Sequence, residues 1–139
     1  MTSSRRASAT ALLLDAGFLI SVDRGEGPAR VFLTAALRHD TRLATTHPVV
    51  AQVWRDGSRQ VRLARFLHSV VIHPFDDGPR VGNLLARSGS IDVVEAHLVT
   101  VAARLSEPIL TGDVDDLEAL SAALDVAPPP ILAWPPGGS

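Results

Sequence analysis

The chain has 139 residues, of which 46% are hydrophobic and 20% are charged, and its formal net charge is −2. These values predict a soluble globular protein with its own core. The protein as a whole is not polycationic, so nucleic-acid binding would have to rely on a local patch. The chain has no cysteine. It also has no lysine, and all thirteen of its Lys or Arg residues are arginine. A disulfide framework, a cysteine-ligated zinc site, a P-loop and Schiff-base chemistry are therefore excluded.

The first half of the chain alternates apolar strand patterns with helix patterns. Residues 1–10 are polar, and Asp15 cuts the short apolar run after them, so we expect neither a signal peptide nor a membrane span, and a cytoplasmic protein. Strands are predicted at residues 11–14, 42–46 and 70–72. Helices are predicted at residues 17–22, 29–38, 48–56 and 58–68, the last two capped by Thr46 and Ser58.

The second half continues this alternation. Helices are predicted at residues 79–88, 91–105 and 117–124, and strands at residues 109–111 and 131–133. The helix at 91–105 is apolar on two sides, which predicts burial on both. Strands that alternate with helices imply a parallel sheet of four to five strands, covered on both faces. We expect one domain over residues 11–134, flanked by flexible tails at 1–10 and 135–139, and a core that is aliphatic because only 4% of the residues are aromatic.

Three acidic residues lie where an α/β protein usually keeps its chemistry. Asp15 and Asp113 follow predicted strands, and Asp92 begins the helix that also carries Glu95. Ligands bind at the carboxyl ends of parallel strands, and clustered carboxylates repel one another unless a divalent cation such as Mg²⁺ or Mn²⁺ neutralises them. An alternative interpretation is purely structural, with Asp92 and Ser90 as helix caps and Asp113 as part of a turn before a helix.

The order and spacing of three short stretches resemble a known family. They are residues 12–20 (LLLDAGFLI), 92–97 (DVVEAH) and 110–117 (LTGDVDDL). Together they resemble the PIN-domain ribonucleases, especially the VapC-type toxins of bacterial toxin–antitoxin pairs. The resemblance implies a three-layer α/β/α fold and a Mg²⁺- or Mn²⁺-dependent endoribonuclease that cleaves RNA, binds a cognate antitoxin and forms a homodimer.

The resemblance also implies roles for individual residues. Asp15, Asp92 and Asp113 would be the catalytic, metal-binding core, and Asp116 and Glu95 would be further metal-binding acids. Thr111 would donate a hydrogen bond to Asp15 or to a metal-bound water. The cation would lower the pKa of a bound water and neutralise charge that develops on the phosphate.

The chain departs from the family at Gln52, where the family usually has Glu. Glutamine keeps an oxygen but loses the charge, so one hypothesis is a weakened second metal position. An alternative function is accordingly a catalytically weakened PIN-like binding or regulatory module. A third class, a receiver domain, would need a lysine that the chain lacks.

Arginines follow the Gln52 helix in a cluster: Arg55, Arg59, Arg62 and Arg65. Such a cluster suits RNA phosphates or the carboxylates of an antitoxin, although a run of charges is more often a solvated face. The five histidines show no metal-ligand spacing, and Trp54 and Trp134 are expected in the core or at an interface.

Overall fold

The computed structural model describes residues 10–136, and these form seven helices and five strands. The strands are β1 (Ala11–Leu14), β2 (Arg42–Thr46), β3 (Val71–His73), β4 (Ile109–Thr111) and β5 (Ile131–Ala133). The helices are α2 (Ala16–Asp23), α3 (Gly27–Arg38), α4 (His47–Val53), α5 (Val61–Leu67), α6 (Gly78–Ser88), α7 (Val93–Leu105) and α8 (Val114–Ala122). Of the two predicted tails, only Thr10, Pro135 and Pro136 fall within the described residues.

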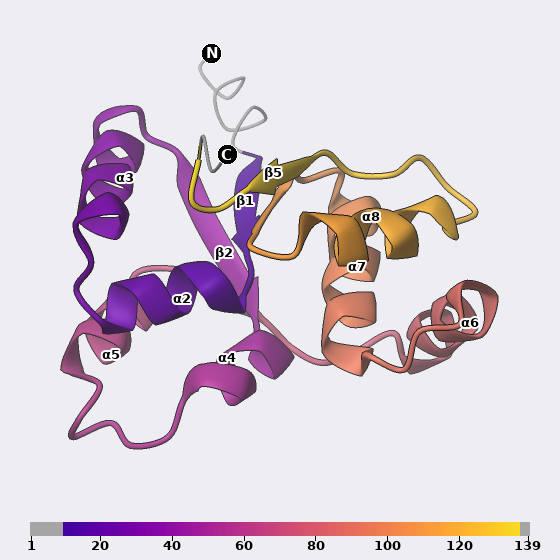
Figure 1. Ribbon diagram of the computed structural model, residues 1–139, viewed down its shortest axis with the longest axis horizontal. Helices are drawn as coiled ribbons and strands as arrows, with labels where there is room; N and C mark the ends of the chain where they lie inside the picture. Colours follow the sequence, from indigo (N-terminus) through magenta and orange to yellow (C-terminus); the bar gives the residue numbers. More distant parts are fainter. Residues whose placement is uncertain (1–9, 137–139) are drawn as a thin grey trace, which may run out of the picture.

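All strand pairs are parallel, and the strand order is β3-β2-β1-β4-β5. Parallel strands are joined by crossover connections, which are right-handed. The connections toward β2 and β3 and those toward β4 and β5 run in opposite directions across the sheet, so their helices lie on opposite faces. Figure 1 shows this arrangement, with α2, α3 and α5 on one side of the sheet and α6, α7 and α8 on the other. The three-layer fold with a five-stranded parallel sheet confirms the prediction. No helix within residues 10–136 combines the length and the apolar character needed to cross a membrane.

The core lies on both sides of β1, whose four residues are all buried. A strand that is covered on both faces has apolar residues at successive positions, and residues 11–14 have this pattern. Helix α7 is buried all round from Glu95 to Ala102, as its two apolar sides predicted. The core is mostly aliphatic, but the few aromatic rings gather around Phe18, whose ring centroid lies 4.8 Å from that of Trp134 and 5.2 Å from that of Phe32.

The connection between α4 and α5 differs from the prediction. Helix α4 ends at Val53 rather than at residue 56, and α5 begins at Val61 without a cap from Ser58. The Gln60 side chain explains the longer connection, because its Oε1 accepts from the backbone N–H groups of Arg55 (2.7 Å) and Asp56 (3.0 Å). Ser58 instead bonds to Asp56. Thr46 does cap α4, as predicted, by accepting from the N–H of Val49.

Candidate metal centre

The strand order places a crevice between β1 and β4. From β1 the chain proceeds to β2 and β3 on one side, and then returns to add β4 and β5 on the other. The connections that leave the carboxyl ends of β1 and β4 therefore diverge to opposite faces of the sheet, and in α/β proteins such a switch point is where ligands bind. Asp15 directly follows β1, and Asp113 follows β4 after one intervening glycine.

Asp15 is fixed by its neighbours on both carboxylate oxygens. Its Oδ1 accepts from the N–H of Ala16 at 2.7 Å, and its Oδ2 accepts from the hydroxyl of Thr111 at 2.7 Å. The residue is only 4% exposed. Burial raises the pKa of Asp15 above its ordinary value, and the negative charges of Asp113 and Asp92 add to this effect, against the two hydrogen bonds.

Thr111 links the two strand-end acids. Its buried hydroxyl donates to Asp15 and accepts from the backbone N–H of Asp113 at 2.9 Å. The hydrogen bond to Asp15 is one of the two that the resemblance implied for this hydroxyl. Asp113 precedes α8 without capping it through its side chain, so its carboxylate is not used by the helix. The threonine thus sets the position of one carboxylate and of the backbone that carries another.

Glu95 reaches the same crevice from α7. The residue is 9% exposed, and no hydrogen bond from a described residue satisfies its carboxylate. Burial, followed by the charges of Asp92, Asp15, Asp113 and Asp116, raises the pKa of Glu95 to about 8. A carboxyl group held this way keeps its proton at neutral pH unless a positive charge joins the group.

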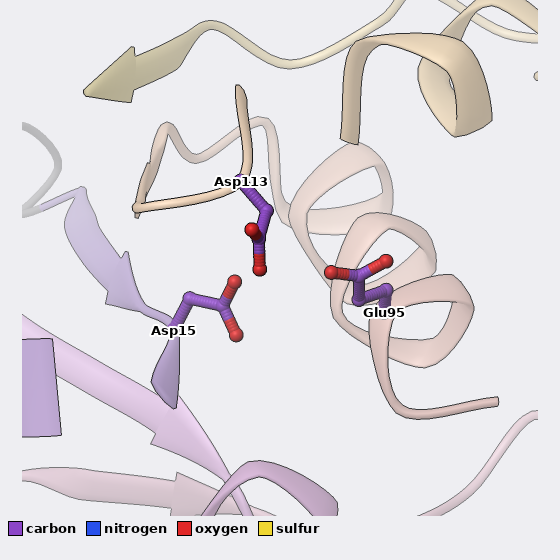
Figure 2. A group of neighbouring side chains, drawn as sticks. All are labelled: Asp15, Glu95 and Asp113. Atoms are coloured by element: carbon purple, nitrogen blue, oxygen red, sulfur yellow. The ribbon is translucent and has the colours of Figure 1, made fainter. Parts of the chain in front are cut away.

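Figure 2 shows the side chains of Asp15, Glu95 and Asp113 pointing toward one another. One carboxylate oxygen from each lies within 4.8 Å of the other two. The three carboxylates repel one another, and the pKa values of Asp15 and Glu95 are raised. A divalent cation bound between them would remove this repulsion. The donor set, made of oxygen atoms alone, fits Mg²⁺ or Mn²⁺.

Asp92 and Asp116 lie at the edge of this group rather than within it. Asp92 is the N-cap of α7, and its Oδ1 accepts from the N–H of Glu95 at 2.9 Å, as the structural interpretation of this residue predicted. The role of Asp92 as a metal ligand stays a prediction. Glu95 lies in the group with Asp15 and Asp113, where Asp92 was expected. Asp116, in the first turn of α8, lines a hollow of about 290 Å³ together with Asp92 and Glu95.

The remaining predicted site residues are dispersed. Gln52 is exposed on α4, a helix that contacts both α2 and α7. Arg55 donates to the carbonyls of Ala51 and Trp54, and Arg59 pairs with Asp56 at 3.8 Å, so both side chains already have partners within the chain. Only Arg62 and Arg65 share a helix, α5.

His97 follows Glu95 by two residues but turns to another side of α7. Its ring is buried, packs edge-on against Phe75, and places Nε2 3.4 Å from Oδ1 of Asp76. Burial lowers the pKa of His97. This ring belongs to the packing of α7, in agreement with the sequence interpretation.

Fold and site together define a three-layer α/β protein with an acidic crevice at the carboxyl edge of its parallel sheet. Solved structures agree. A chain of VapBC2 from Rickettsia felis, in a complex with a promoter DNA fragment, is 14% identical with a TM-score of 0.68, over 89% of this chain and 98% of that one. PAE2754 from Pyrobaculum aerophilum is 18% identical (TM-score 0.58; 88% and 83% covered).

FitAcB from Neisseria gonorrhoeae is also 18% identical, with a TM-score of 0.55 over 84% of this chain and 94% of that one. At such identities the likeness shows the PIN-domain fold, and it confirms the fold that the sequence resemblance predicted. No protein-family profile and no curated protein sequence matches the chain.

Proposed function

We propose that the protein is a Mg²⁺- or Mn²⁺-dependent endoribonuclease of the VapC type, the toxin of a cytoplasmic toxin–antitoxin pair. The observation that carries this proposal is the convergence of Asp15, Glu95 and Asp113 from three separate elements into one crevice. No packing requirement brings three carboxylates together, since their mutual repulsion opposes it. The PIN-domain fold supports the same function.

The chain's own residues divide the work of such a site. Asp15, Glu95 and Asp113 would hold the cation, and Thr111 keeps Asp15 in place. Asp92 and Asp116, which line the same hollow as Glu95, would be further metal-binding acids. When bound, the cation supplies an acidified water and neutralises charge on the phosphate. A protein nucleophile is not required.

An antitoxin is the proposed protein partner, and a groove between α3 and α5 suits it. This groove, of about 360 Å³, has Val22, Ala29, Leu33 and Phe66 in its floor and Arg30, Arg62 and Arg65 on its rim. An amphipathic segment with carboxylates along one edge would bury apolar area there and pair with the arginines. The solved VapBC2 structure, with promoter DNA, concerns such a pair.

A homodimer is proposed from the apolar side chains left in solvent beside the crevice. Ile91 and Val93, on either side of Asp92, are 94% and 41% exposed. Isolated exposed apolar residues are common, but two large ones next to a candidate active site suit an interface between copies of the chain.

Cleavage of RNA by the purified protein tests the proposal directly. We expect single-stranded RNA to be cut internally with Mn²⁺ or Mg²⁺, and to stay intact after chelation with EDTA, because the carboxylates cannot activate water by themselves. A DNA strand of the same sequence is the control substrate. Intact RNA at every metal concentration, together with retained antitoxin binding, would favour the weakened binding module instead.

Gln52 distinguishes these two functions. Replacing it with Glu would restore the acid usual in the family, and we expect the Mn²⁺ concentration for half-maximal cleavage to fall by about ten-fold, since an added carboxylate strengthens oxygen ligation of a hard cation. Ala51→Glu adds the same charge at the neighbouring exposed position and should leave that concentration unchanged. If both variants behave as the wild type does, Gln52 has no part in metal binding.

A further inference from the structure

A second large cleft lies away from the carboxylates, between α6, the C-terminal half of α7 and the residues after α8. Its volume is about 740 Å³, and Arg80, Asn83 and Arg87 of α6 line one wall. We call it the arginine cleft. Leu84 and Leu124 provide apolar surface inside it. Neither the carboxylate site nor the groove between α3 and α5 includes these residues.

Two of its arginines can receive a ligand. Arg80 and Arg87 are seven residues apart on α6, hence two turns apart on one face and about 10 Å apart along the helix. Arg87 uses its Nε to donate to the carbonyl of Ala123 at 2.8 Å, which fixes the guanidinium and leaves its terminal nitrogens. Arg80 is exposed, and among the described residues it has neither a hydrogen bond nor an ion pair.

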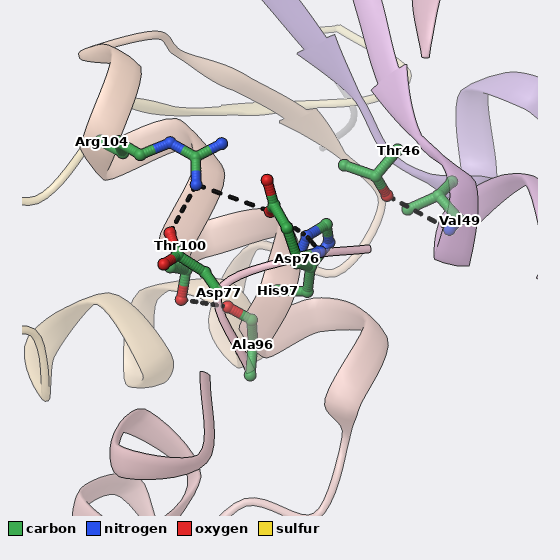
Figure 3. A network of polar contacts seen from close by, with 8 residues as sticks. All are labelled: Thr46, Val49, Asp76, Asp77, Ala96, His97, Thr100 and Arg104. Carbon is green, nitrogen blue, oxygen red and sulfur yellow. Dashed lines mark hydrogen bonds and ion pairs between the residues drawn. The ribbon is translucent and has the colours of Figure 1, made fainter. Parts of the chain in front are cut away.

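The third arginine of the cleft is already paired. Figure 3 shows Arg104 bound to Asp76 and Asp77, with an Nη1 to Oδ1 distance of 3.6 Å for Asp76. This pairing neutralises the charge of Arg104 within the arginine cleft. The available positive charge therefore lies along α6, on Arg80 and Arg87, and one further carboxylate, Asp125, lines the cleft with them.

The arginine cleft adjoins the hollow at the metal centre. That hollow, lined by Ser88, Asp92, Glu95, Asp116 and Leu120, begins on α6 at the residue after Arg87. On the other wall, Leu120 and Leu124 are about one helical turn apart. The contact between Arg87 and Ala123 lies between the two hollows. A chain-like ligand that leaves the carboxylates by this route passes directly over Arg87.

We propose that the arginine cleft holds the RNA strand on one side of the scissile phosphate, with Arg80 and Arg87 contacting successive backbone phosphates. The inference rests on the proposed ribonuclease function and extends it to the path of the substrate. Guanidinium groups bind phosphate oxygens in pairs, and apolar surface between them can accommodate unstacked bases. An acidic protein segment is the competing occupant, but unlike RNA it has no phosphodiester bond to place at a cation held by Asp15, Glu95 and Asp113.

The test compares Arg80→Gln, Arg87→Gln and the double variant with Arg38→Gln, a matched exposed arginine on α3, across the sheet. The first measurement is binding of a fluorescent single-stranded RNA in EDTA, which does not depend on metal. The logarithm of the association constant falls as the logarithm of the salt concentration rises. Each arginine that no longer binds a phosphate should make this slope less steep by about 0.7, or by about 1.4 for the pair. Arg38→Gln should keep the wild-type slope.

The second measurement is steady-state cleavage with Mn²⁺. For a long RNA we expect KM to rise about five-fold for each residue replaced, with kcat within about two-fold, because the arginines bind the phosphates equally well in the ground state and the transition state. A minimal RNA that spans only the scissile bond should be cleaved as well by the variants as by the wild type. Arg80→Gln changes an exposed side chain, so its result stands even if Arg87→Gln unfolds.

Separate outcomes overturn the two proposals. Wild-type protein that cleaves RNA, with unchanged KM and salt slope in all variants, would overturn the cleft assignment and leave the nuclease. Wild-type protein that never cleaves RNA would overturn the nuclease itself. Variants that bind RNA normally but no longer retain a copurified protein partner would show that the arginine cleft is a protein-docking surface, and the inference would be wrong.

Discussion

Replacing Asp15 with Asn is expected to reduce Mn²⁺-dependent RNA cleavage by about a thousand-fold or more, equivalent to about 4 kcal/mol of lost transition-state stabilisation. Asn has the same shape and keeps one oxygen, but it removes one of the three charges that would hold the cation. The carboxylate is also the one fixed most firmly, by Ala16 and Thr111. Cleavage of a fluorescent RNA at saturating Mn²⁺ measures the effect.

The reduced cleavage should come from metal binding and not from unfolding. Burial raises the pKa of Asp15, which means that its ionised form is disfavoured in the folded protein. A neutral Asn removes this penalty but also one of the two acceptors used by Ala16 and Thr111, so the melting temperature in EDTA should change little. The rise in melting temperature on adding Mn²⁺ should disappear. Asp115→Asn, at an exposed position in the first turn of α8, is the control. Equal cleavage by Asp15→Asn and the wild type would defeat the catalytic assignment.

The strand-end acids could be predicted because their positions follow from the pattern of the chain. An apolar run such as residues 11–14, bounded by polar residues, is typical of a buried strand, and Asp15 after it has to lie at the edge of the sheet. The same reasoning holds for residues 109–111 and Asp113. Parallel alignment then places both acids at one edge, without knowledge of any side-chain contact.

The roles of Asp92 and Glu95 depend on a smaller detail. A helix that begins at residue 91 would have Asp92 in its first turn, whereas a helix that begins at Val93 makes Asp92 the cap. Helix ends are uncertain by one or two residues from pattern alone, and that difference decides which acid is turned into the crevice. The arginine cleft could not be predicted for another reason. Arg80, Arg87 and Leu124 come together only through the packing of α6 on α8, which no local pattern encodes.

Glu95→Gln is expected to change how stability depends on pH. In metal-free protein the pKa of Glu95 is about 8, against an ordinary value of 4.5, so the folded state holds a proton that the unfolded state releases. The stability contributed by this group is full below pH 4.5 and is lost progressively as the pH rises from 4.5 through about 8. Gln cannot ionise, so the variant should be the more stable protein at pH 8 and nearly matched at pH 4.5.

Mn²⁺ should reverse this ranking. A cation that binds the ionised carboxylates stabilises the wild type in proportion to the logarithm of its concentration, and the binding releases the proton of Glu95 to solvent. The Gln variant lacks both effects. Urea unfolding at pH 5 to 8, in EDTA and in Mn²⁺, measures them, and Glu118→Gln, exposed on α8, is the matched control. Parallel pH curves for wild type and Glu95→Gln in EDTA would mean that the carboxyl of Glu95 is already solvated and ionised, and that the three acids do not crowd one another in the crevice.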